Sequence, residues 1–153
     1  MSDPFGLQRF VVAQDRDGIY GQAMRELQAG RKYSHWMWFV FPQVKGLGNS
    51  SMAQHYAISG RAEAEAYLAH PVLRRRLIEC ARALTELDTS DPERVFGPVD
   101  AQKLHSSMTL FAAAAPDEPV FRTVTEEFVE VDAVAVNATD REPSTCNTGS
   151  PRK

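Results

Sequence analysis

Cysteines and long apolar stretches are both scarce in this chain, and each shortage excludes a class of protein. The 153 residues include two cysteines, Cys80 in a helical pattern and Cys146 in a polar segment. A structural disulfide between two cysteines so placed is not expected. No window approaches the ~20 apolar residues of a membrane span, and the first residues lack the basic and apolar regions of a signal peptide. We therefore expect a soluble, cytoplasmic protein with no membrane partner.

The chain also lacks the basic surplus of a dedicated nucleic-acid-binding protein. It holds 17 Lys and Arg against 20 Asp and Glu, which gives a net charge of −3. Proteins that neutralise a phosphate backbone usually carry an excess of positive charge. We expect no nucleic acid as the main partner, although a local basic cluster can still hold one small anion.

Recognisable metal-binding patterns are missing as well. The sequence contains neither C-x-x-C nor H-E-x-x-H, and the histidines show no metal-ligand spacing. We therefore expect no metal and no cofactor. The four histidines are His35, His55, His70 and His105.

What the chain does contain is typical of a helical globular domain. Hydrophobic residues make up 43% and charged residues 24%, as in an average soluble protein. Apolar residues from Leu73 to Leu87 recur in steps of four and three, which predicts a helix over residues 72–88. Similar patterns predict helices over residues 4–14, 17–30, 51–58, 59–70 and 100–115, and a last one marked by Phe121, Val124 and Phe128. Their expected N-caps include Asp3, Asp17, Ser50 or Ser51, and Ser59. Asp91-Pro92-Glu93 is expected to start a short turn that Gly97 closes.

The predicted fold is therefore all-α. We expect a single compact multihelical domain over residues 1–136. Residues 137–153 are polar and rich in serine and proline, so we expect them to form a flexible, disordered tail.

The most informative segment is a dense aromatic motif. It reads Lys32-Tyr33-Ser34-His35-Trp36-Met37-Trp38-Phe39-Val40-Phe41-Pro42-Gln43 and includes both tryptophans. So apolar a run must be buried, as a short helix or an extended segment. Trp36 and Trp38 either stack against a planar ligand such as a nucleobase or only fill the core. His35 is either a titratable site group or a hydrogen-bonded core residue.

A glycine turn follows the aromatic motif. Its sequence is Lys45-Gly46-Leu47-Gly48-Asn49-Ser50-Ser51, which combines a lysine, flexible glycines and the start of a helix. These are the ingredients of an anion site, although the spacing is not that of a Walker motif. The alternative is a loop in which the glycines allow tight turns and a serine caps the helix.

Two further clusters carry polar side chains on predicted helices. Lys103, Ser106 and Ser107 lie within about one turn, just before an apolar stretch, so at least one hydroxyl is expected to be buried. No G-x-S-x-G motif surrounds either serine, which favours hydrogen bonding to a ligand or the core over nucleophilic catalysis. An arginine triplet and four glutamates are interpreted as solvated surface; they are Arg74, Arg75, Arg76, Glu63, Glu65, Glu126 and Glu127.

Several of these segments also carry a family resemblance. They include Asp3-Pro4-Phe5, Leu7-Gln8-Arg9-Phe10, Gly30-Arg31-Lys32, His35 to Gln43, Gly46-Leu47-Gly48, Tyr56-Ala57-Ile58-Ser59, Lys103-Leu104 and Ser106-Ser107-Met108-Thr109-Leu110-Phe111. Over roughly residues 3–128 they resemble the core of the bacterial family known as domain of unknown function 1810. The resemblance implies a compact multihelical fold and no established activity. After Phe128 the chain departs from the family pattern, through either divergence or a change of reading frame.

Two functional hypotheses remain open. The first is a small-molecule site, enzymatic or not, for an anionic and planar, nucleotide-like ligand. The second is a non-catalytic protein interaction module in which the aromatic residues are only core. A polar-rimmed cavity at either tryptophan would favour the first, and a dry core around both would favour the second. Neither a catalytic residue nor the oligomeric state is assigned; the candidate ligand-binding residues are His35, Trp36, Trp38, Gln43, Lys45, Gly46, Gly48, Ser51, Lys103, Ser106 and Ser107.

Overall fold

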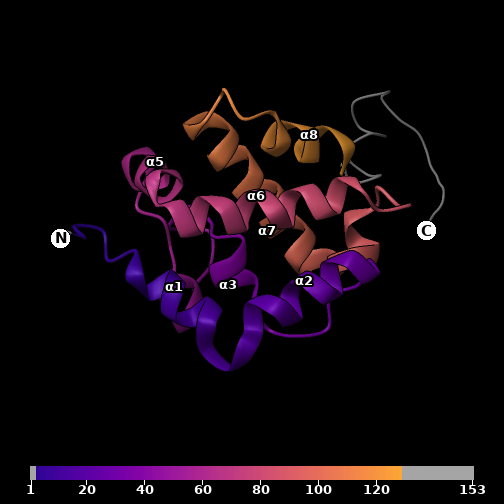
Figure 1. Cartoon of the computed structure of the whole chain (residues 1–153), viewed down its shortest axis with the longest axis horizontal. Coiled ribbons are helices and arrows are strands. Elements are labelled where there is room, and N and C mark those ends of the chain that lie inside the picture. Colours follow the sequence, from indigo (N-terminus) through magenta and orange to yellow (C-terminus); the bar gives the residue numbers. More distant parts are fainter. Residues whose placement is uncertain (1–2, 129–153) are drawn as a thin grey trace.

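The computed structural model describes residues 3–128, and its regular structure is helical (Figure 1). Within this range the β structure is limited to one isolated parallel bridge between Val44 and Ile58. The all-α prediction is therefore confirmed. None of the helices in the described range has both the length and the apolar character needed to cross a bilayer. The tail expected over residues 137–153, and the domain boundary before it, lie outside the described residues.

Helix α6 is the centre of the arrangement. It crosses the middle of the molecule in Figure 1, with α1 and α2 along one side and α8 along the other, and it also packs against α5. Helix α7 packs against α5 and α8 and completes the core. The elements are α1 (Gln8–Asp15), the 3-10 turn η1 (Arg16–Gly18), α2 (Ile19–Ala29), α3 (Met37–Val40), α4 (Ser51–His55), α5 (Arg61–Ala69), α6 (Pro71–Thr85), α7 (Pro92–Ala114) and α8 (Pro119–Glu127).

The apolar stripe of α6 is buried as its spacing predicts. Leu73, Leu77, Cys80 and Leu84 all lie in the core, because steps of three and four place them on one side of the helix. Burial raises the pKa of the Cys80 thiol to about 12. Cys80 is therefore a packing residue in its protonated form.

The N-terminal helices begin and end differently from the prediction. The Asp3 carboxylate accepts hydrogen bonds from the backbone N–H groups of Leu7 at 2.8 Å and Gln8 at 3.0 Å, so α1 begins at Gln8 rather than residue 4. Asp17 does not cap α2, because it lies inside η1 with a left-handed φ of 53°. Gly30 does end α2, in a left-handed conformation that glycine adopts without steric cost.

The other predicted caps are confirmed in part. The Ser50 hydroxyl accepts a hydrogen bond from the N–H of Ala53 at 3.1 Å, so Ser50 rather than Ser51 caps α4. At the start of the predicted turn, the Asp91 carboxylate accepts a hydrogen bond from the N–H of Glu93 at 3.0 Å. Helix α7 breaks at Gly97, where φ is 82°, and then continues to Ala114. The sequence correctly predicts both the turn and the longer helix after it.

Glu63 was predicted to lie on the surface, and this was wrong. Its side chain is buried, with 3% of the residue surface exposed. It accepts a 2.9 Å hydrogen bond from Arg9 and two 2.8 Å hydrogen bonds from the N–H and hydroxyl of Ser59. Ser59 consequently donates its hydroxyl proton to Glu63 instead of capping α5. The carboxylate is buried because an arginine from α1 neutralises it there.

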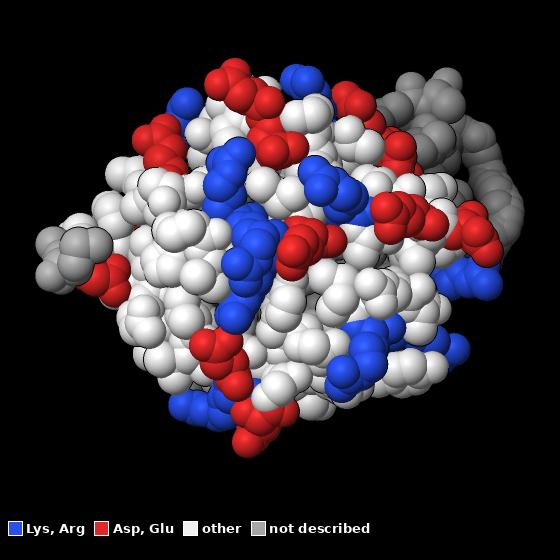
Figure 2. Space-filling model, viewed as in Figure 1, with Lys and Arg blue, Asp and Glu red and all other residues white. Residues whose placement is uncertain are grey.

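The interpretation of the arginine triplet as solvated surface also needs a correction. Arg74 and Arg75 are exposed, but Arg76 is largely buried and donates to Gln14 Oε1 at 3.1 Å and Asp15 Oδ1 at 2.7 Å. Arg76 therefore ties α6 to the end of α1. Figure 2 shows this face of the molecule, on which basic side chains alternate with acidic ones rather than forming a large field of one sign.

Candidate functional site

The two tryptophans of the aromatic motif occupy different environments. Helix α3 is a single buried turn, so of the two predicted alternatives the short helix is confirmed and the extended segment is not. Trp36 precedes it, is fully buried, and packs against the rings of Phe41 and Phe96 with centroid distances of 6.3 and 6.4 Å. Trp38 is half-buried and lines a pocket. Of the two candidates, only Trp38 faces a space in which a ligand could lie.

Trp36 is held by a buried carboxylate that sequence reasoning missed. Glu26 Oε1 accepts a 3.0 Å hydrogen bond from the indole Nε1 of Trp36 and two more from the backbone N–H groups of Tyr33 and Ser34. Glu26 Oε2 accepts hydrogen bonds from the Ser34 hydroxyl at 2.6 Å and the Gln22 amide at 2.7 Å. The only signal in the sequence is that Glu26 falls three residues after Ala23, on the buried side of α2.

These hydrogen bonds determine the charge state of Glu26. Burial acts to raise the pKa of its carboxyl group, but the hydrogen bonds from Ser34, Gln22 and Tyr33 outweigh burial and lower the pKa to about 2. Glu26 is therefore a buried carboxylate at neutral pH. It fixes the start of the aromatic motif against α2, and this in turn positions Trp38.

The pocket at Trp38 lies between α3, the glycine turn and the segment that contains α4. Its volume is about 360 Å³, within the range of small-molecule sites. The backbone around it is held by two hydrogen bonds of 2.8 Å, from Lys45 N–H to the Ile58 carbonyl and from Ile58 N–H to the Gln43 carbonyl. The lining residues are Trp38, Gln43, Val44, Lys45, Gly46, Leu47, Gly48, Asn49, Ala53, Gln54, Tyr56 and Ala57.

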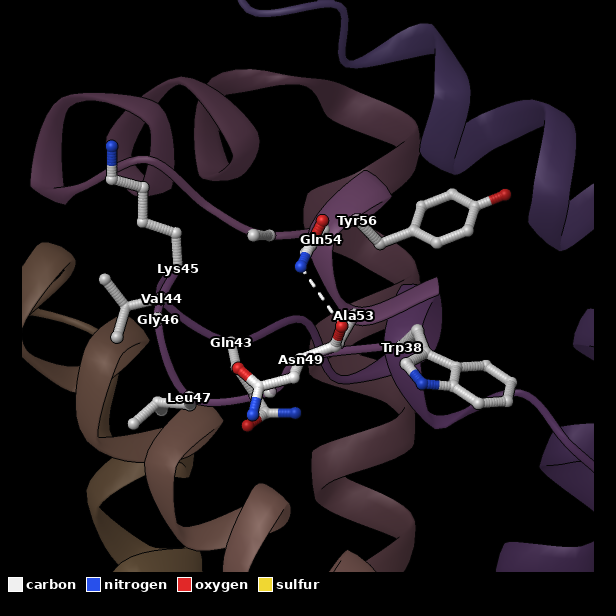
Figure 3. Close-up of a pocket in the computed structure, with 12 residues that line it drawn as sticks. Trp38, Gln43, Val44, Lys45, Gly46, Leu47, Asn49, Ala53, Gln54 and Tyr56 are labelled. Carbon is white, nitrogen blue, oxygen red and sulfur yellow. Dashed lines mark hydrogen bonds between the residues drawn. The ribbon is translucent and has the colours of Figure 1, made fainter. Parts of the chain in front are cut away.

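The polar lining consists mainly of carboxamides. Gln54 Nε2 donates to the backbone carbonyl of Asn49 at 3.1 Å, which holds the turn against α4 (Figure 3). Gln43 and Asn49 also line the pocket with carboxamide side chains (Figure 3). Among the residues 3–128, the pocket has one charged lining side chain, Lys45. In Figure 3 the Lys45 side chain extends on the side opposite the Trp38 indole.

Gly48 is required by the close packing of the turn on α4. A Cβ atom at this position would lie 2.8 Å from the Cβ of Ala53, a separation that real side chains do not show. The tight turn therefore depends on the absence of a side chain at residue 48. This packing places the glycine turn against α4, and residues of both segments line the pocket.

His35 and Lys103 contact Trp38 without lining the pocket. The imidazole of His35 is exposed and stacks at 6.5 Å from the Trp38 ring, with an angle of 29° between the planes. The ammonium group of Lys103 lies 5.7 Å from the centroid of the Trp38 ring, in a cation–π contact. The structure therefore groups a histidine and a lysine from distant parts of the sequence around one indole.

The candidate serines lie away from the pocket wall. Ser51 is the exposed first residue of α4, next to the capping Ser50. Ser106 is half-buried, and Ser107 is fully buried with no hydrogen-bond partner for its hydroxyl in the described part of the chain. None of the three lines the pocket.

Taken together, five of the candidate residues share the pocket: Trp38, Gln43, Lys45, Gly46 and Gly48. Sequence reasoning missed Asn49, Gln54 and Tyr56 as lining residues. Gln54 and Tyr56 reach the pocket because α4 ends after five residues and the chain returns to pair with residue 44, and no local pattern reveals that return. Within residues 3–128, no group of three or more His, Cys, Asp or Glu side chains is placed to hold a metal ion.

Comparison with known proteins places the chain among proteins without an assigned activity. A family model described as "Protein of unknown function (DUF1810)" matches residues 4–140. The crystal structure of the conserved hypothetical protein Rv1873 from Mycobacterium tuberculosis is 48% identical in sequence and superposes with a TM-score of 0.79. That match covers 82% of this chain and 89% of the other. No curated protein matches the chain. The chain belongs to the DUF1810 family of proteins of unknown function.

Proposed function

We propose that the pocket beside Trp38 binds a small anionic ligand with a planar ring, of the nucleotide type. One observation carries the proposal: Trp38 of the aromatic motif and Lys45 of the glycine turn line the same hollow. Taken separately, the aromatic motif could be explained as core packing and the glycine turn as a tight turn of the backbone. A shared pocket combines a stacking surface with a positive charge, which neither alternative explains.

The lining chemistry fits a nucleotide in three ways. A ring stacked on Trp38 gains about 1–3 kcal/mol. The carboxamides of Gln43 and Asn49 each carry a donor and an acceptor, which match the mixed donor and acceptor edge of a nucleobase. Lys45 provides a cation for a phosphate, in a wall without a lining carboxylate among the described residues.

The rival hypothesis, a non-catalytic interaction module, explains Trp36 better than Trp38. Trp36 is sealed in the core and its indole N–H is satisfied by Glu26. Trp38 is half-buried and lines the pocket together with the carboxamide residues Gln43, Asn49 and Gln54. A purely structural motif would have no need to keep this second indole open to a polar hollow.

A thermal-shift screen tests the proposal. The probes are the four ribonucleoside monophosphates, the matching nucleosides and inorganic phosphate. At about 1 mM, a ligand with a Kd of about 10 µM stabilises the folded state by about 2.7 kcal/mol. We expect at least one monophosphate to raise Tm clearly and its nucleoside to do so less.

The Lys45→Ala variant then tests the site. It should weaken the monophosphate roughly tenfold by calorimetry, the size of one charge-assisted contact, and leave the nucleoside unchanged. The Tm of the free protein should not move, because exposed lysines contribute little to stability. Arg16→Ala removes an exposed charge outside the pocket and is the control. The proposal fails if no probe raises Tm, or if Lys45→Ala and Trp38→Leu both bind like the parent protein.

A further inference from the structure

A lysine ammonium group lies over the ring of each tryptophan in the aromatic motif, and both lysines form an ion pair with Asp100. Lys32 lies 5.1 Å from the Trp36 ring centroid and Lys103 lies 5.7 Å from that of Trp38. Asp100, near the start of the long part of α7, reaches Lys32 at 2.9 Å and Lys103 at 3.5 Å. One negative charge thus faces two positive charges directly beside the pocket tryptophan.

The two lysines are held to different degrees. The Lys32 side chain is 9% exposed and forms the shorter ion pair, so it is the more firmly held of the two. The Lys103 side chain is 24% exposed and sits three residues after Asp100 on the same helix, at the longer distance. Ion pairs of this partly exposed, same-helix kind are weak. Lys103 can therefore leave Asp100 without stranding that carboxylate, because Lys32 still neutralises it.

Lys45 is part of the pocket lining, whereas Lys103 is not. Lys103 is next to the Trp38 indole, whereas Lys45 extends on the side opposite that indole (Figure 3). A ligand that uses both lysines must carry two separated anionic groups with its ring between or beside them.

We infer that Lys103 is a second anion-binding group of this site and that the ligand class is a nucleoside bisphosphate with one phosphate at each end of its ribose. The inference rests on the proposed function. Lys45 holds one phosphate, the base stacks on Trp38, and Lys103 exchanges Asp100 for the other phosphate. Asp100 is then an internal competitor that keeps Lys103 in place while the site is empty.

Affinity ratios test this inference. For each nucleoside, the Kd of the monophosphate is divided by the Kd of the bisphosphate, both measured by calorimetry on the full chain. We expect a ratio of roughly ten in the parent protein, one charge-assisted contact. Lys103→Met keeps the alkyl stem over Trp38 but removes the charge, so the ratio should fall to about one. The Lys103→Arg variant keeps the positive charge and should therefore keep most of the parental affinity ratio.

The Asp100→Asn variant should change the affinity ratio in the opposite direction, because it removes the carboxylate that competes with the phosphate for Lys103. It should raise the ratio roughly threefold, the size of a weak ion pair. Arg94→Ala removes an exposed charge from the same helix and should leave the ratio at its parental value. The inference is overturned if bisphosphates bind no tighter than monophosphates, or if Lys103→Met retains the parental ratio. Monophosphate binding that depends on Lys45 survives either result, and if no nucleotide binds at all the proposed function falls as well.

Discussion

Replacement of Glu26 by glutamine tests whether a buried carboxylate holds the aromatic motif in place. Glu26 is 3% exposed and accepts hydrogen bonds from three residues of the motif and from Gln22. A carboxamide has the same shape but presents an NH₂ group where the native side chain presents an acceptor. All the groups that hydrogen-bond to Glu26 are donors. In the Glu26→Gln variant, at least one of them therefore loses its acceptor, and another lies against the new NH₂ group, which is itself a donor.

The size of the expected stability loss follows from the pKa of the Glu26 carboxyl group. The hydrogen bonds lower the pKa of Glu26 from 4.5 to about 2. Since the folded state binds the proton more weakly than the unfolded state, folding is stabilised at neutral pH by about 3 kcal/mol. This stabilisation is present above about pH 5 and is lost as the pH falls toward 2. Glu26→Gln should therefore lower the free energy of unfolding by about 3 kcal/mol at pH 7.

Urea unfolding at several pH values measures this effect. The difference in unfolding free energy between the parent and Glu26→Gln should shrink steadily between about pH 5 and pH 2.5. The control is Glu65→Gln, because the Glu65 side chain is 51% exposed and forms its ion pair with Arg61 on the same helix. That variant should cost less than about 0.5 kcal/mol. If the two variants behave alike, or if the difference does not depend on pH, the role assigned to Glu26 is wrong.

Two further predictions concern the core and the tryptophans. Leu77 is 1% exposed, so Leu77→Ala should open a cavity and lower the free energy of unfolding by about 2–5 kcal/mol. The 46% exposed Val12 is its control, and Val12→Ala should stay within about 0.5 kcal/mol; equal losses would show that the buried face of α6 is misassigned. Iodide should quench the fluorescence of Trp38 but not of Trp36, so Trp38→Phe should abolish the quenchable fraction, and quenching that persists in this variant would contradict the described burial.

Local patterns predict the helices well because the information lies within a few residues of each position. The apolar stripe of α6 and the glycine that ends α2 depend on helical periodicity and on one backbone conformation. Buried charges are different. The partner of Glu63 is Arg9, 54 positions earlier, and nothing near residue 63 distinguishes it from the exposed Glu65. Its burial depends on a contact between helices that no local pattern encodes.

The same distinction applies to the candidate site. The sequence by itself determined that residues 32–51 are unusual, because two tryptophans, a histidine and a glycine turn rarely coincide without a structural or functional reason. It did not determine which tryptophan faces the pocket. Trp36 and Trp38 are two positions apart, but Trp36 lies just before α3 with non-helical backbone angles, so helical periodicity does not fix where its indole points. Only the packing of this single turn, with Glu26 holding one indole and Lys103 lying over the other, decided which side became core and which became pocket wall.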